Sequence, residues 1–199
     1  MKDFIQSLTN KRVTPLELKV DQVGQPEEIA HVLAHTFRFG RHTFTPYSVA
    51  EHCVRGSWAL PSAFAGAFLL HELSEVYLPD VPSPVKAALC LRSSLGQAGV
   101  TPEVVSWSEL ERSHTSTILA AWNLSSLEPL IYSPEVKAMD LAMLLTEKRD
   151  LLGPEPEPWG IEAPTLTDVQ ERELSARITP MAPMVAKQAW LNRFTQLFW

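Results

Sequence analysis

The sequence predicts a mostly α protein, folded as a single helical bundle with a minor β element near its N-terminus. Two observations lead to this expectation. Apolar residues recur at helical spacing in most segments of the chain, and one β-branched, partly alternating stretch lies near the start. The chain of 199 residues is 45% hydrophobic, which is enough to bury the core of one domain.

We expect helices over 25–37, 45–60, 61–78, 101–122, 133–152, 167–178 and 183–198. Local signals support several of these starts: segment 45–60 opens with Thr before Pro, and segment 133–152 opens with Ser before Pro. Residues 11–23 are expected to hold a short strand or two. The Gly-containing stretch 38–46 and the proline-rich stretch 153–164 are expected to be loops.

The whole chain, 1–199, is interpreted as one domain. Its core is expected to span about 10–152, followed by a C-terminal helical extension over 165–199. The proline-rich stretch between them resembles a surface loop rather than an interdomain linker, because few residues follow it.

Composition excludes several classes of function. The net charge is −6 and no basic stripe occurs, which argues against binding to a nucleic-acid polymer. The first residues lack the apolar run of a signal peptide, and no apolar run is long enough to span a membrane, so a cytoplasmic location is expected. Cys53 and Cys90 have no metal-binding spacing, and we expect both to be reduced core residues.

The segment 61–78 is apolar on nearly every face until it reaches His71, Glu72 and Glu75. Burying unpaired carboxylates costs several kcal/mol each, so a compensating partner is expected. A divalent cation would compensate, and imidazole with carboxylate suits Zn, Mn, Fe or Co. The alternative is a core network of hydrogen-bonded polar groups without metal.

Two other helical segments carry isolated residues of the same kind. His52 lies in 45–60 and Asp140 lies in 133–152, each among apolar neighbours. Together with His71 and Glu72 they form a plausible metal-binding set with positions left for water. The stretch "HELSE" does not complete the HExxH zinc motif, because Glu75 stands where the second histidine would be.

Two further histidines have helical spacing. His31 and His35 lie four residues apart and could bind metal, on a helix that also carries Glu27 and Glu28. We expect a solvated or packing role for them, because the segment lacks the downstream context that follows His71.

These residues resemble the HD-domain phosphohydrolase superfamily. "VAEHCV" supplies His52, "LLHELSEVYLPDVPSPVK" supplies the doublet His71–Glu72, and "KAMDLAMLLTEKRDL" supplies Asp140. The chain is most similar to the small 5′-deoxynucleotidase branch, which includes phage enzymes that remove triphosphate from dATP. The resemblance covers residues 10–152. It departs at Glu72, where the family has aspartate, and the extra methylene moves the carboxylate by about 1.5 Å.

The resemblance implies an HD-type fold and a mechanism. A divalent transition metal (Co, Mn, Zn or Fe) held by the four ligands would activate water for attack on the α-phosphorus of a nucleotide. Glu75 would correspond to the general acid/base or orienting residue, and Asp80 to the carboxylate that orients water or protonates the leaving 5′-oxygen. Mg²⁺ could accompany the substrate phosphates.

Four cations are candidates for binding the phosphates. Arg38 matches the family's phosphate-binding arginine, and Arg41 lies in the same loop. Lys86 closes the proline-rich turn, and Lys137 precedes Asp140 by three residues on nearly the same helical face. The aromatic candidates for a base pocket are Phe37, Phe39, Phe44 and Tyr47.

Four cations favour a deoxynucleoside triphosphate as substrate, with dATP as the boldest prediction. A deoxynucleoside 5′-monophosphatase is the alternative, and a non-catalytic nucleotide- or metal-binding module is a third, motivated by Glu72. The family tends toward homo-oligomers, and the aromatic segment 185–199 is a plausible subunit contact. If the chain is encoded by a phage, its location would be the host cytoplasm.

Overall fold

A computed structural model describes residues 4–88, 90–93 and 103–199 and has the expected mostly α fold. The helices are α1 (Pro26–His35), α2 (Val49–Ala59), α3 (Ser62–Leu69), α4 (Ser83–Ala88), α5 (Trp107–Ala121), α6 (Glu128–Ile131), α7 (Pro134–Leu151), α8 (Asp168–Ser175) and α9 (Pro183–Phe198). Four short 3-10 turns join them, namely η1 (Val20–Gln22), η2 (Phe39–Arg41), η3 (Leu73–Val76) and η4 (Ser125–Leu127).

The β structure consists of two small antiparallel pairs. β1 (Ile5–Gln6) pairs with β2 (Arg12–Val13), with Ile5 opposite Val13. β3 (Cys90–Ser93) pairs with β4 (Glu103–Ser106), with Cys90 opposite Ser106. The first pair confirms the expected minor N-terminal β element, and the second pair was not expected from the sequence.

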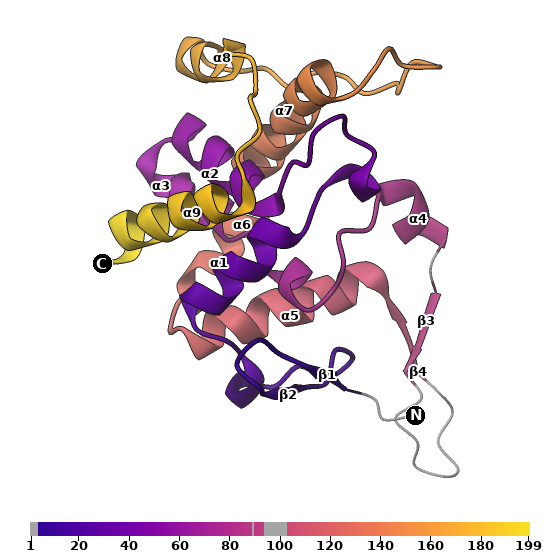
Figure 1. Ribbon diagram of the computed structural model, residues 1–199, viewed down its shortest axis with the longest axis vertical. Helices are drawn as coiled ribbons and strands as arrows, with labels where there is room; N and C mark the ends of the chain where they lie inside the picture. The colour runs from indigo at the N-terminus through magenta and orange to yellow at the C-terminus, as the bar shows by residue number, and fades with distance from the viewer. Residues whose placement is uncertain (1–3, 89, 94–102) are drawn as a thin grey trace.

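The centre of the bundle is formed by α1, α2, α3 and α9 (Figure 1). Helix α9 packs against the other three, and α5 crosses below them, beside η3. Trp190 of α9 is fully buried and stacks on Phe194 with ring centroids 5.2 Å apart. The C-terminal helix therefore contributes Ala186, Trp190 and Phe194 to the hydrophobic core.

The expected helix over 61–78 is interrupted in the structure, which corrects the sequence prediction. Helix α3 ends at Leu69, and the chain continues through backbone bonds of the tighter i to i−3 type before η3. The His71 side chain turns back, and its Nδ1 lies 2.6 Å from the Phe68 carbonyl oxygen. His71 and Glu72 therefore stand in a turn, and not on the face of a continuous helix.

Two helix starts also differ from the prediction. Helix α2 begins after Ser48, whose side chain accepts a hydrogen bond from the Glu51 amide, and not at Thr45. Helix α5 begins after Ser106, because the preceding residues pair as β4, and Ser106 and Glu109 form a capping box. Helix α7 begins at the expected Ser133 cap, and 153–164 has no helix or strand, as expected.

Candidate metal centre and adjoining cavity

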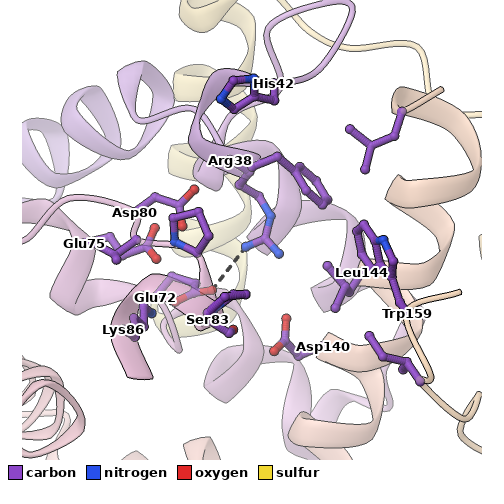
Figure 2. A pocket seen from close by; sticks show the side chains of 16 residues that line it. Arg38, His42, Glu72, Glu75, Asp80, Ser83, Lys86, Asp140, Leu144 and Trp159 are labelled. Carbon is purple, nitrogen blue, oxygen red and sulfur yellow. Dashed lines mark hydrogen bonds and ion pairs between the residues drawn. The ribbon is translucent and has the colours of Figure 1, made fainter. Parts of the chain in front are cut away.

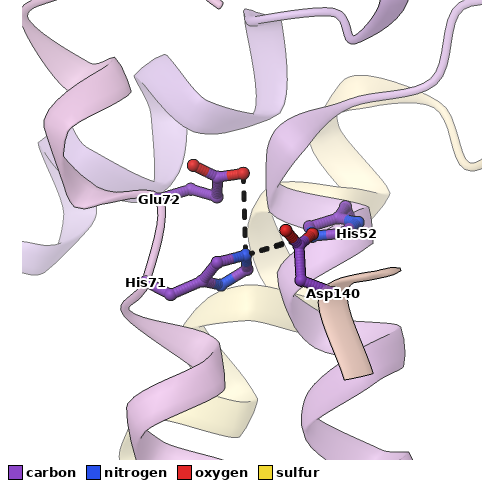
Figure 3. Close-up of side chains that lie close together, drawn as sticks. All are labelled: His52, His71, Glu72 and Asp140. Carbon is purple, nitrogen blue, oxygen red and sulfur yellow. Dashed lines mark hydrogen bonds and ion pairs between the residues drawn. The ribbon is translucent and has the colours of Figure 1, made fainter. Parts of the chain in front are cut away.

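Four side chains from three parts of the fold meet at one point (Figure 3). His52 comes from α2, His71 and Glu72 from the turn after α3, and Asp140 from α7. One ligand atom from each lies within 4.8 Å of the others, so the group could hold a divalent metal ion. The structure thus brings together the four residues that the sequence analysis selected.

The hydrogen bonds of the two histidines fix which ring nitrogen is free. Nδ1 of His71 lies 2.6 Å from the Phe68 carbonyl, and Nδ1 of His52 lies 2.6 Å from a carboxylate oxygen of Glu147. Both partners only accept hydrogen bonds, so each Nδ1 must donate its proton. In the neutral rings, each Nε2 then carries a lone pair.

These two Nε2 atoms face each other 3.2 Å apart. Two lone pairs at this distance repel, so a proton or a metal ion must lie between them. Asp140 lies 3.3 Å from Nε2 of His52 and 3.7 Å from Nε2 of His71. Two imidazole nitrogens and a carboxylate that converge in this way form a donor set suited to a transition metal.

Electrostatics at the cluster favour a positive charge at its centre. Burial opposes protonation of His71, but Glu72 and Asp140 outweigh it and raise the pKa of this imidazole well above its usual value. Burial also opposes ionisation of Asp140, yet hydrogen bonds from the two histidines hold its pKa well below the usual range. The four side chains therefore favour a positively charged group, either a proton or a metal ion, at the centre of the cluster.

The sequence analysis missed Glu147, which lies directly behind the cluster. Its side chain is fully buried and contacts both His52 and Arg38, with Nε of Arg38 3.1 Å from Oε2. Glu147 follows Asp140 by seven residues, two helical turns along the same face of α7. That spacing could have indicated that Glu147 faces the cluster. Because Glu147 begins a run of charged residues, it resembles a solvent-exposed helix end instead.

Beside the cluster lies a cavity of about 750 Å³ (Figure 2). Its polar lining consists of Arg38, His42, Glu72, Glu75, Asp80, Ser83, Lys86 and Asp140. Its apolar lining includes Phe39, Leu144, Leu152, Trp159 and Ile161. Volumes in this range are typical of small-molecule sites.

Glu75 and Asp80 face this cavity with unsatisfied oxygens. Glu75 is only 4% exposed, and among the residues that the structure describes, neither its Oε2 nor Oδ2 of Asp80 has a hydrogen-bond partner. Burial, then Glu72 and Asp80, raise the pKa of Glu75 well above its usual value. Burial likewise raises the pKa of Asp80. A raised pKa favours the protonated carboxyl, which is the form that can donate a proton.

The four candidate cations do not all reach the cavity. Arg38 lines it, with Nη1 3.2 Å from Glu72, and Lys86 lines it while its Nζ lies 2.6 Å from Glu111. Arg41 and Lys137 are exposed and do not belong to the lining. The structure therefore does not bring these two to the site.

A strained turn separates the two arginines. Phe39, Gly40 and Arg41 have positive φ angles of 57°, 56° and 70°. For the two non-glycine residues this conformation costs about 1–3 kcal/mol each, and such strain is commonly stored at functional sites. The turn follows Arg38 directly, and it leaves Arg38 buried while Arg41 is exposed.

Of the four aromatic candidates for a base pocket, only Phe39 lines the cavity. Tyr47 is fully buried in a small cluster with Leu151 and Ile178, and Phe44 is 83% exposed. Phe37 forms an isolated bridge with Ser48. The aromatic surface that the sequence analysis did not anticipate is Trp159.

His31, His35 and Cys53 lie outside the metal cluster. The His31 and His35 rings lie against each other, with centroids 4.2 Å apart, on α1. Cys53 is a buried free thiol, as expected, and the side chain of Cys90 lies outside the described part of the chain.

Comparison with known proteins shows a similarity that extends over nearly the whole chain. The chain is 29% identical over 194 residues to the uncharacterized protein YfdR of Escherichia coli (strain K12). The aligned region covers 98% of this chain and 95% of that protein, so the likeness extends to the C-terminal helices. No family model matches the chain. Within the described ranges, no helix combines the length and apolarity needed to cross a membrane.

Proposed function

We propose that this protein is a metal-dependent phosphohydrolase that acts on deoxynucleotides. The observation that carries the proposal is the convergence of two imidazole Nε2 atoms and two carboxylates at the edge of a cavity of nucleotide size. The resemblance of the quoted motifs to HD-domain phosphohydrolases supports the same reaction class.

His52, His71, Glu72 and Asp140 would hold a divalent ion of the Co, Mn, Zn or Fe type. When bound, such an ion supplies Lewis acidity toward a phosphoryl oxygen and lowers the pKa of water. Arg38 presents Nη1 at the rim of the cluster and would orient a substrate phosphate there. Glu75, with its raised pKa, would donate a proton to the leaving 5′-oxygen, assisted by Asp80.

The number of cations in the cavity indicates how many substrate phosphates the site can bind. The sequence analysis favoured a triphosphate, and dATP in particular, because it counted four cations. Of these four, the structure places Arg38 and Lys86 in the cavity lining, and each already contacts a carboxylate. This observation favours the second candidate, a deoxynucleoside 5′-monophosphatase; a triphosphate would depend more on Mg²⁺ carried by its own phosphates.

The test is a panel of the four deoxynucleoside monophosphates and the four triphosphates, incubated with protein loaded with Co²⁺ or Mn²⁺. Release of inorganic phosphate identifies a monophosphatase, and release of tripolyphosphate identifies a triphosphohydrolase. The variant Glu75→Gln should retain metal and lose turnover, while Glu135→Gln, an exposed change on α7, should behave as the wild type. Metal-loaded protein that releases neither product from any nucleotide would refute the proposal.

A further inference from the structure

We propose that Trp159, on the proline-rich loop 153–164, is the surface on which the nucleobase of the substrate stacks. This inference rests on the proposed function and names a part of the same site. The loop lies beyond the residues 10–152 that carry the family resemblance, so neither the motifs nor the comparisons assign it a role.

The loop is held against α7 at a defined place. Lys148, in the last turn of α7, forms an ion pair with Glu155 and lies 4.7 Å from the centre of the Trp159 ring. The ring therefore has a cation on one side, and Trp159 also lines the cavity. A loop without helix or strand thus contacts α7 through Glu155 and Trp159 and places an indole on the cavity wall.

Trp159 leaves more than a third of its surface exposed, and it does so on the wall of the cavity. Three tryptophans are more than a third exposed, namely Trp58 at 54%, Trp159 at 38% and Trp199 at 90%. Of these three, Trp159 is the one that lines the cavity. A large apolar ring that is left open on the wall of a cavity has surface to offer a ligand. Figure 2 shows it beside Leu144, on the same wall of the cavity as Asp140.

The spacing along α7 matches the two ends of a nucleotide. Asp140 belongs to the metal cluster, and Leu144 lies one turn further, about 6 Å along the helix axis. A phosphate held beside Asp140 and Arg38 would leave the attached group pointing at Leu144 and Trp159. A nucleotide has the same arrangement, with an anionic phosphate at one end and a flat base at the other.

A planar ring fits this end of the cavity better than a charged group. Leu144 lies beside Trp159, and the apolar lining also includes Leu152 and Ile161, so these four residues offer no charge to a ligand. Stacking on an aromatic side chain uses the π-face that every base has, so it is tolerant of base identity. The inference therefore predicts affinity for the base with weak discrimination among the four bases.

The experiment compares a ligand that has a base with one that lacks it. Binding of deoxyadenosine 5′-monophosphate and of 2-deoxyribose 5-phosphate is measured by calorimetry on Mn²⁺-loaded protein, with Glu75→Gln present throughout to prevent turnover. Trp159→Ala should weaken binding of the nucleotide about tenfold and leave binding of the sugar phosphate unchanged. Trp159→Phe, which retains a ring, should recover most of the loss. Trp199→Ala, which removes a 90% exposed indole at the chain end, is the matched control.

Three results would overturn the inference: equal losses for both ligands, no loss for either, or no binding of the nucleotide to the Glu75→Gln protein. The proposed function fails separately. If the wild type releases no phosphate while Trp159→Ala still weakens only the nucleotide, the stacking surface stands without the hydrolase. If the wild type hydrolyses nucleotides and Trp159→Ala shows no base-dependent loss, the hydrolase stands alone.

Discussion

Glu147 is a fully buried carboxylate that links two parts of the site. Burial alone would raise its pKa, but Arg38 and His52 outweigh burial and lower it, so the group is ionised. It accepts a hydrogen bond from Nδ1–H of His52 and thereby leaves Nε2 free to face the metal-binding position. Through its other oxygen it holds Arg38, which in turn contacts Glu72. Carboxylate partners of this kind orient a ligand histidine and increase its basicity.

The variant Glu147→Gln should therefore bind metal about 10–100-fold more weakly, because the amide keeps the shape of the side chain but loses the charge. Competition with a chromophoric chelator for Zn²⁺ or Co²⁺ measures this directly. Glu135→Gln, on the exposed face of the same helix, is the control. Unchanged metal affinity in Glu147→Gln would show that this carboxylate only packs against its neighbours.

His114 makes stability depend on pH. It is fully buried on α5, one ring nitrogen lies 2.6 Å from the Pro15 carbonyl oxygen, and burial lowers its pKa below the usual 6.5. Its other ring nitrogen has no partner among the described residues, so the protonated ring would be poorly accommodated.

Because the folded-state pKa lies below the unfolded value, the unfolded chain binds more protons once the pH falls below about 6.5. The contribution of His114 to stability is thus complete above that pH and is lost as the pH falls toward the folded pKa. Chemical denaturation at several pH values should show this slope in the wild type and a reduced slope in His114→Gln. Identical slopes would contradict the prediction.

At the scale of helices, α2 and α3 approach closely because Gly56 lacks a side chain. A Cβ at this position would lie 2.1 Å from a ring atom of Phe68, which is fully buried. The Phe68 ring in turn lies against His52 and His71, with centroids 5.4 Å and 4.3 Å away. Packing of the two helices and placement of two metal-ligand candidates therefore depend on one glycine.

Gly56→Ala should lower the free energy of unfolding by about 1–3 kcal/mol, because the core is overpacked. The better helix propensity of alanine, about 1 kcal/mol, offsets this only in part. Metal affinity should fall as well, since Phe68 must move. Gly66→Ala is the milder control, because its Cβ would meet the Phe198 ring at 3.0 Å near the chain end. A Gly56→Ala protein as stable as the wild type would contradict the close approach.

Elements with local signals were predictable, and elements set by tertiary contacts were not. The start of α7 is indicated by two adjacent residues, the N-cap Ser133 and Pro134. The end of α3 depends instead on the His71 ring, which turns back to the Phe68 carbonyl and faces ligands from α2 and α7. No pattern within 61–78 contains that information.

The site shows the same division. The four ligand candidates stand out as polar residues in apolar segments, so the sequence allowed them to be selected together. Glu147 is followed by three charged residues and is indistinguishable from a solvated helix end. Trp159 lies in a loop without periodicity, and its place on the cavity wall is set by Lys148 at the end of α7.

In the whole molecule, the metal cluster joins elements that are distant along the chain. Its ligands come from α2, the turn after α3, and α7, while α9 closes the core on the side of α1, α2 and α3. An ion bound only by the folded chain stabilises it by mass action. At a free concentration of 100 times Kd this amounts to about 2.7 kcal/mol.

Each kcal/mol shifts the Tm of a chain of this size by about 2–4 °C, so EDTA should lower the Tm by several degrees and added Mn²⁺ or Co²⁺ should restore it. His71→Gln should abolish the metal-dependent shift, because it removes one of the two converging imidazoles. The double variant His31→Gln, His35→Gln should keep the shift, since this histidine pair on α1 lies outside the cluster. If EDTA leaves the Tm unchanged and elemental analysis finds no stoichiometric ion, the four side chains form a metal-free polar network. That result would also refute the proposed hydrolase function, because this function requires the metal ion.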